Sequence, residues 1–260
     1  MPGFFQKPYI MRIQYISDVH LEFLPKLPKI KVLEGVDVLC LAGDIGYPYS
    51  GIYREFLIKM NSLFKKVFLI TGNHEYYNSD KYGSHTIDEV NETIASLISN
   101  HKLTNITFLN NSFEVYNDVL FAGTTLWSNI QSQNMNDICL MNDFKQITDL
   151  TYDTYKLLHL KSCHFIENLL ADVKTPAKKI VMMTHHLPSF DLIDERFTFS
   201  DTNCFYASKC DKYFVEPIKV WIYGHTHIPN KTIKNNIQFV CNPKGYPSEN
   251  TSVKNEIINV

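Results

Sequence analysis

The chain has 260 residues, of which 45% are hydrophobic and 20% are charged, and its formal net charge at pH 7 is −2. This composition is ordinary for a soluble globular protein, and the length suits one large α/β domain or two small ones. The near-neutral charge gives no indication of a nucleic-acid surface, because phosphate backbones attract clustered Lys and Arg.

The first half of the chain alternates apolar strand patterns with helical patterns. These patterns predict strands at 11–16, 36–41 and 67–71 and helices at 51–64 and 87–99. The run at 36–41 is apolar at all but one position, which is typical of a fully buried strand. Residues 1–10 are expected to form an extension, and residues 11–260 a single domain.

The second half contains further short strands and the clearest helix. Strands are predicted at 107–109, 113–116, 120–122, 180–183, 220–223 and 238–241. A helix is predicted at 151–170, with Thr151 as its N-cap. Its histidines, His159 and His164, are five residues apart and do not form an i, i+4 metal pair, so we expect both to be surface or packing residues. The alternation of strands and helices favours an α/β fold.

The segment 187–211 is long and irregular. It is interpreted either as a substrate-facing excursion or as ordinary packing with a short helix, because long ordered loops in compact domains tend to be functional.

Six cysteines occur without C-x-x-C spacing, so neither a zinc ribbon nor a disulfide framework is expected. The N-terminus has no charged region followed by a long apolar core, and no segment approaches the length of a transmembrane helix. We therefore expect a reduced, intracellular, cytoplasmic protein that does not bind membranes.

Five short clusters of Asp, Asn and His each follow a predicted strand. They are Asp18-Val19-His20, Gly43-Asp44, Gly72-Asn73-His74-Glu75, Thr184-His185-His186 and Gly224-His225-Thr226-His227. One such cluster alone is common turn chemistry. Five of them at strand ends place imidazole, carboxylate and amide groups at one edge of a sheet, which is what a divalent metal site requires.

In this order, the five clusters resemble those of the calcineurin-like metallophosphoesterases, from residue 11 to about residue 242. The resemblance implies a four-layer α/β sandwich in which two mixed β-sheets are flanked by α-helices. It also implies a hydrolase, a phosphatase or phosphodiesterase, in which a hydroxide bridging two metal ions attacks phosphorus in line. Mixed N/O ligation suits manganese, with Fe, Zn, Mg, Co or Ni as alternatives, better than calcium.

Carried onto this chain, the resemblance implies seven metal ligands and one acid. The ligands are Asp18, His20 and His227 for one ion, Asn73, His185 and His225 for the other, and Asp44 as the bridge. His74 is implied to protonate the leaving oxygen or to stabilise the charge that develops there.

Four further residues are candidates for substrate contact: His186, Trp127, Asp143 and Arg196. For three of them a structural role is the alternative, because His186 can pack against 187–188, Trp127 can be a core residue and Arg196 can be a surface residue.

The residues after Asp44 depart from the pattern of Ser/Thr protein phosphatases. Ile45-Gly46-Tyr47-Pro48-Tyr49 lacks the acidic residue and the Arg that those enzymes carry. This absence weakens the alternative hypothesis of a phosphoprotein phosphatase. It also leaves open which residue orients His74, with Glu75 as one candidate. The expected substrate is a small-molecule or nucleotide phosphoester. The alternative from another class is a non-catalytic scaffold on the same fold.

Overall fold

The computed structural model describes residues 10–131, 138–172, 179–249 and 254–260. Within these ranges the chain forms two β-sheets. The first has the strand order β11-β1-β2-β3-β4, and the second β5-β6-β7-β8-β10-β9. The extension expected at 1–10 lies, apart from Ile10, outside the described residues.

The strand bounds agree closely with the predicted ones. The first sheet contains β1 (Arg12–Ile16), β2 (Val38–Ala42), β3 (Lys66–Ile70), β4 (Ile106–Phe108) and β11 (Ile257–Asn259). The second contains β5 (Ser112–Tyr116), β6 (Val119–Thr124), β7 (Lys179–Thr184), β8 (Ile218–Tyr223), β9 (Asn230–Lys234) and β10 (Ile237–Cys241). Both sheets are mixed. Pairs such as β1–β2 and β7–β8 are parallel, whereas the edge strands β11, β5 and β9 pair antiparallel with their neighbours.

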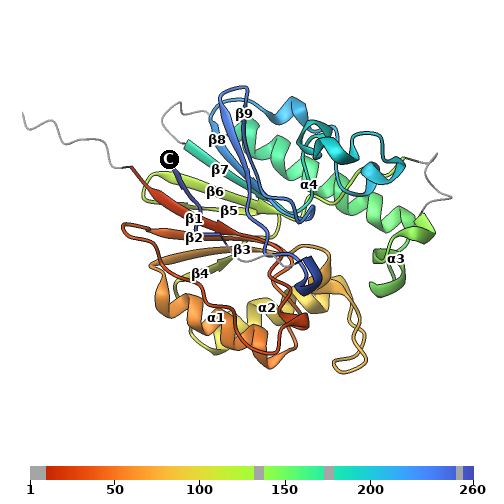
Figure 1. Ribbon diagram of the computed structural model, residues 1–260, viewed down its shortest axis with the longest axis horizontal. Coiled ribbons are helices and arrows are strands. Elements are labelled where there is room, and N and C mark those ends of the chain that lie inside the picture. Colours follow the sequence, from red (N-terminus) through yellow and green to blue (C-terminus); the bar gives the residue numbers. More distant parts are fainter. Residues whose placement is uncertain (1–9, 132–137, 173–178, 250–253) are drawn as a thin grey trace, which may run out of the picture.

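The helices lie outside the two sheets and complete four layers (Figure 1). They are α1 (Gly51–Leu63), α2 (Ile87–Asn100), α3 (Asp143–Gln146) and α4 (Tyr152–Asp172). Helices α1 and α2 cover the first sheet, and α4 covers the second. The four-layer sandwich predicted from the sequence is thus confirmed.

Alternation along the strands explains how these layers hold together. In β2, Leu39 and Leu41 pack toward α1, whereas Cys40 packs between the sheets. There Phe68 of β3 stacks on Phe121 of β6, with ring centroids 4.2 Å apart. Successive side chains of a strand point to opposite faces, so a strand buried on both faces must be apolar throughout.

Two strands, β9 and β11, were not predicted. β9 is a mostly exposed edge strand whose sequence, NKTIK, has no apolar run. It pairs with β10, and the two strands are joined by a two-residue turn, Asn235-Asn236. Both turn residues have positive φ (50° and 61°), as a tight hairpin turn requires. β11 has only three residues and exists through its pairing with β1. Both strands depend on a partner strand rather than on their own pattern.

Thr151 caps α4 as predicted, because its Oγ1 accepts a hydrogen bond from the Thr154 amide at 3.2 Å. His159 is buried and His164 is exposed, so the two histidines do occupy packing and surface positions. Segment 187–211 folds into three short 3-10 helices, η4 (Phe190–Leu192), η5 (Glu195–Phe197) and η6 (Asp201–Phe205), before η7 (Asp211–Tyr213).

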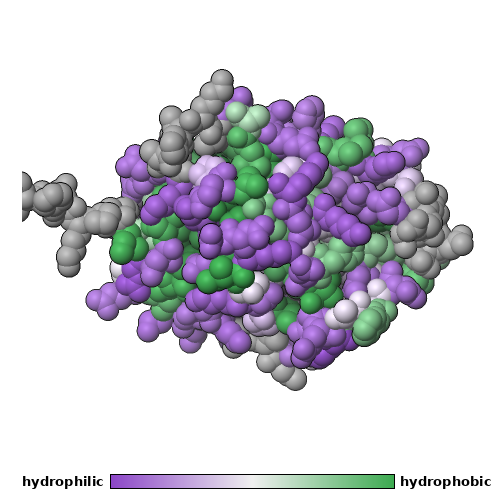
Figure 2. Space-filling model, turned by 90° about the horizontal axis from the view of Figure 1, so that it is seen from above, coloured by the Kyte–Doolittle hydropathy of each residue, from purple (hydrophilic) through white to green (hydrophobic). Residues whose placement is uncertain are grey.

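Hydrophilic side chains cover much of the face seen from above, with hydrophobic atoms showing between them (Figure 2). None of the helices in the described ranges combines the length and the apolar character needed to cross a membrane.

Candidate metal centre

The five clusters come together where β1, β2, β3, β7 and β8 end. Backbone hydrogen bonds join their loops: the Asp18 amide donates to the Gly43 carbonyl, and the Gly224 amide to the His185 carbonyl, each at 3.0 Å. The first bond joins strand ends of the first sheet, and the second joins strand ends of the second sheet. The Asp18 carboxylate links the two sheets, because its Oδ1 accepts from the His225 amide at 2.9 Å.

Five residues of these clusters have a left-handed backbone. The φ angles are 51° for Asp18, 50° for His20, 53° for Asp44, 72° for His225 and 53° for His227. This conformation costs a non-glycine residue roughly 1–2 kcal/mol. Such strain persists only where surrounding structure enforces it, and its concentration at one edge makes that edge the candidate functional site.

Two glycines allow the loops to approach each other. A Cβ on Gly72 would collide with Asp44 Oδ1 and with the His185 ring, and a Cβ on Gly224 would lie 2.8 Å from Asp18 Oδ2. Glycine at these positions is therefore required for the polar side chains to converge.

The first group of donor atoms contains Asp18, His20 and His227. His20 Nδ1 lies 2.9 Å from Glu22 Oε1 and His227 Nδ1 lies 3.0 Å from Glu249 Oε2, so both Nδ1 atoms carry the proton. The two Nε2 atoms lie 3.0 Å apart, and His227 Nε2 is 3.4 Å from Asp18 Oδ1. With each Nδ1 held by a carboxylate, these three atoms are oriented as ligands of one cation would be.

The second group contains buried donor atoms without a hydrogen-bond partner. His185 Nδ1 donates to the Ala42 carbonyl at 2.9 Å, which leaves its buried Nε2 without a partner. The Asn73 amide nitrogen donates to Asp143 Oδ1 at 2.8 Å, so its Oδ1, also buried, faces the site without a partner. Ligand atoms of His185, His225 and Asp44 lie within 4.8 Å of one another.

Asp44 lies between the two groups. Its Oδ2 is 3.3 Å from His185 Nε2 in one group and 3.8 Å from His20 Nε2 in the other. Its Oδ1 accepts the His74 amide at 2.8 Å. Burial raises the pKa of Asp44, but the neighbouring histidines, His185 first, outweigh burial and hold it well below its usual value. The seven atoms fit the donor set of two divalent cations, and their role as ligands stays a prediction.

Glu22, rather than Glu75, orients His74. Glu22 Oε1 lies 3.1 Å from His74 Nδ1, and the Tyr246 hydroxyl lies 3.0 Å from His74 Nε2. Burial lowers the pKa of His74, but Asp44 and Glu22 outweigh it and raise the pKa above its usual value. Glu75 instead accepts three backbone amides, those of Gly72, Asp44 and Ile45, and ties the β2 and β3 loops together.

Above this centre lies a cavity of about 340 Å³. One group of its lining residues, which we call the strand-end wall, comprises Asp44, Asn73, His74, His225 and His227. A second group, the loop wall, comprises Leu140, Met141, Thr202, Phe205 and Tyr206. No Lys or Arg occurs among the described residues that line the cavity.

The four residues considered for substrate contact have different positions. Asp143 lines the cavity, but it also holds Asn73 and accepts the Tyr77 hydroxyl at 2.6 Å. His186 and Trp127 are buried, with ring centroids 5.6 Å apart, and neither is among the described lining residues. Arg196 is exposed and binds Asp194 at 2.7 Å. The structure thus brings only Asp143 of these four to the cavity.

Sequence reasoning missed Glu22, Tyr246 and Glu249. Glu22 lies two residues after His20, in η1 (Leu21–Phe23). A carboxylate so close to a predicted metal ligand could have been recognised as a partner for a histidine of the site. Tyr246 and Glu249 follow β10, whose end reaches the same edge but carries no histidine. A search of every strand end, including those without histidine, would have found this loop.

Comparison with known proteins identifies the family of the chain. A family model described as calcineurin-like phosphoesterase matches residues 11–229. An uncharacterized protein of Acanthamoeba polyphaga mimivirus, L509, is 33% identical over 267 residues, which cover 92% of this chain and 93% of that protein.

Two solved structures share the fold at low sequence identity. The phosphopantetheinyl hydrolase of Mycobacterium tuberculosis has a TM-score of 0.73 at 16% identity, with 95% of each chain covered. A protein of Thermus thermophilus has a TM-score of 0.56 at 10% identity, with 97% of this chain and 99% of that chain covered.

Proposed function

The chain belongs to the calcineurin-like phosphoesterase family, and we propose that it hydrolyses a small-molecule or nucleotide phosphoester with two divalent metal ions. The observation that carries the proposal is the set of donor atoms that converge around Asp44. The Nε2 atoms of His20 and His227 lie 3.0 Å apart, and the buried His185 Nε2 and Asn73 Oδ1 have no hydrogen-bond partner. Mixed N/O donors of this kind suit Mn, Fe, Zn or Co.

Bound divalent ions would acidify a water molecule and offset the charge of the phosphoryl oxygens. The protein's own contribution is positional. Asp44 would serve both ions through one carboxylate, and Asp143 keeps the Asn73 oxygen directed inward. His74 lines the cavity and would donate a proton from Nε2 to the leaving oxygen, with Nδ1 held by Glu22.

The loop wall supports an ester with an uncharged or weakly charged organic group. An adjoining cavity of about 260 Å³ shares Thr202, Tyr206 and Thr226 with the first and is lined by Ile193 and Phe197. Such a surface can bury apolar or aromatic parts of a leaving group. A phosphopeptide with its additional charges finds no Lys or Arg among the described lining residues of the first cavity.

A hydrolysis panel tests the proposal. It contains p-nitrophenyl phosphate, its bis-ester, cyclic nucleotides, nucleotides and phosphopeptides, each with Mn, Mg, Zn and Ni. We expect cleavage of small esters and weak cleavage of phosphopeptides. Fewer than one metal ion per chain in protein purified without chelator, together with no hydrolysis in added Mn, would instead support a non-catalytic scaffold.

The acid role of His74 is tested by His74→Asn, with the exposed His101→Gln as control. Loss of general acid catalysis lowers rates by roughly 10²–10⁴-fold. We expect that loss for esters with poor leaving groups and a much smaller one for p-nitrophenyl esters, with the metal content unchanged. Near-normal turnover of a poor leaving group by a metal-loaded variant would exclude the role.

A further inference from the structure

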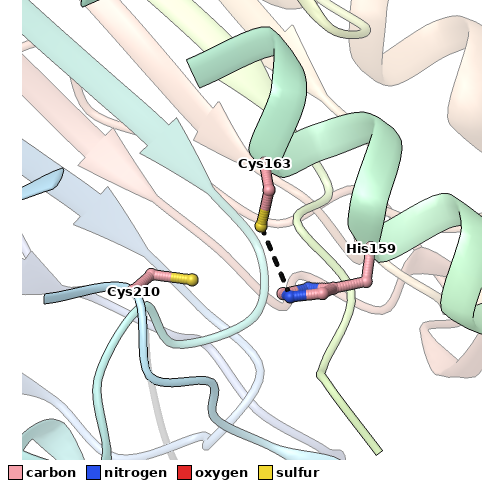
Figure 3. A group of neighbouring side chains, drawn as sticks. All are labelled: His159, Cys163 and Cys210. Atoms are coloured by element: carbon pink, nitrogen blue, oxygen red, sulfur yellow. Dashed lines mark hydrogen bonds between the residues drawn. The ribbon is translucent and has the colours of Figure 1, made fainter. Parts of the chain in front are cut away.

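A second cluster of metal-binding side chains lies between α4 and the end of segment 187–211. His159 and Cys163 are one helical turn apart on α4, and Cys210 immediately precedes η7. The three side chains point toward one another (Figure 3). Their ligand atoms all lie within 4.8 Å of one another. None of the three belongs to the catalytic cavity's described lining.

Backbone contacts determine which nitrogen of His159 faces the sulfurs. Its Nδ1 lies 3.1 Å from the Leu126 carbonyl and 3.2 Å from the Trp127 carbonyl, both of which can only accept. Nδ1 therefore carries the proton, and the bare Nε2 faces Cys163. Histidines that bind metals are typically oriented in this way, by a backbone acceptor on the other nitrogen.

The spacing of His159 and Cys163 matches that of two ligands in tetrahedral coordination. Zn–S and Zn–N bond lengths of about 2.3 and 2.05 Å separate N and S ligands by roughly 3.5 Å. His159 Nε2 and Cys163 Sγ are 3.4 Å apart. Cysteine binds metal as the thiolate.

We propose that His159, Cys163 and Cys210 form a site for a thiophilic divalent cation of the zinc type, separate from the catalytic centre. The cation would take one nitrogen and two sulfurs, with a fourth position left for water. Each thiol that binds releases its proton to solvent. His159 and Cys210 are buried, whereas Cys163 is partly exposed and offers the ion a route inward.

The position of Cys210 gives this site a structural consequence. The Cys210 amide donates to the Pro188 carbonyl at 2.9 Å, and the Ser208 amide to the Leu187 carbonyl at 3.0 Å. These bonds close the base of segment 187–211, which carries Thr202, Phe205 and Tyr206 of the loop wall. A cation bound by Cys210 and α4 would anchor that base to the helix.

Cobalt substitution tests the proposal without any measurement of activity. The seven proposed catalytic ligands include no sulfur, so a sulfur-to-cobalt charge-transfer band in the near ultraviolet reports thiolate coordination elsewhere. We expect reduced wild-type protein titrated with Co²⁺ to develop this band, and Zn²⁺ to abolish it by displacement.

Three variants locate the band. Cys163→Ser and Cys210→Ser should each lose or strongly weaken it, and His159→Gln should shift its position and lower the affinity. Cys139→Ser, which changes an exposed cysteine outside the cluster, should retain it. Circular dichroism and retained cobalt d–d bands from the catalytic centre verify that each variant is folded. Added zinc should also raise the thermal midpoint more for wild type than for Cys163→Ser, because only wild type offers the complete sulfur site in addition to the catalytic centre.

Three outcomes would overturn the proposal. The first is the absence of a charge-transfer band in reduced wild-type protein that displays the catalytic d–d bands. The second is a band that persists undiminished in folded Cys163→Ser and Cys210→Ser. A Cys163–Cys210 disulfide found by mass spectrometry, with no thiolate-bound metal after reduction, would make the pair a redox couple and contradict a metal site.

Discussion

The two walls of the catalytic cavity are built differently. On the strand-end wall, polar side chains project from tight loops in which Asp44, His225 and His227 have a left-handed backbone. On the loop wall, neutral side chains project from short 3-10 turns and from the segment before α3. The strand-end wall follows strands that each pair with a neighbouring strand on both sides. Most of the loop wall lies in a segment that contains 3-10 helices of three to five residues.

The difference separates chemistry from specificity. Donor atoms that bind cations must converge within a few tenths of an ångström, which strand ends joined by backbone hydrogen bonds achieve. Neutral side chains on surface turns can vary without disturbing that geometry. We therefore expect changes on the strand-end wall to lower turnover and changes on the loop wall to alter KM.

Asp44→Asn tests the strand-end wall most severely. The variant removes the one charged oxygen pair that lies between both groups of donors, so we expect metal loss and a fall in kcat of roughly 10³-fold, as for the loss of an essential stabilising group. Metal analysis and hydrolysis of the ester preferred in the panel measure both effects. Asp37→Asn, which alters a surface partner of Lys65, is the control. Normal metal content and rate in Asp44→Asn would remove the basis for a bridging role.

Glu22→Gln should have the next largest effect. Its carboxylate holds both His20 and His74 by their Nδ1 atoms, and removal of such an outer partner costs roughly 10–100-fold in metal affinity or activity. The exposed Glu34→Gln serves as the matched control. Titration of metal-free protein with Mn, followed by kcat for a poor leaving group, separates the loss at His20 from the loss at His74. If both the Mn affinity and kcat were unchanged, Glu22 would not orient His20 or His74 for function.

Tyr206→Ala should act on KM and leave kcat nearly unchanged. Tyr206 lines both cavities, and its ring lies 4.9 Å from the His225 ring. Loss of one packing or hydrogen-bonding contact of about 1 kcal/mol corresponds to a KM increase of roughly 5-fold. Phe199→Ala, an almost fully exposed residue of the same segment, is the control. A loss confined to kcat would instead assign the loop wall to catalysis.

Arg196→Ala should have the smallest effect. Its guanidinium is exposed and already paired with Asp194, and such surface pairs contribute roughly 0–1 kcal/mol. We expect kcat and KM to stay within about twofold of wild type, because a weak surface pair is all that is lost. A KM increase of about tenfold, equivalent to about 1.4 kcal/mol, would identify Arg196 as a phosphate contact that reaches the cavity in the substrate complex.

Local rules made much of the fold and of the candidate centre predictable. Apolar runs located β2 and β7 to within two residues, because a buried strand needs apolar side chains on both faces. The five polar clusters follow these runs directly. Parallel pairing aligns the clusters after β1, β2 and β3 at one edge of the first sheet, and those after β7 and β8 at one edge of the second. The side chains of the strand-end wall could therefore be predicted from short stretches of the chain.

Contacts between distant segments were decided only by the tertiary structure. Glu22 and Tyr246 meet His74 across 52 and 172 residues, and no local pattern links such positions. In α4 the sequence pairs His159 with Cys163 at i, i+4, but the third member, Cys210, is 47 residues further along the chain than Cys163. By itself the sequence determined most of the strands and the polar clusters at their ends, because periodicity and turn chemistry are local. The partners that orient each side chain, and the second cluster, arise only when folding brings remote loops into contact.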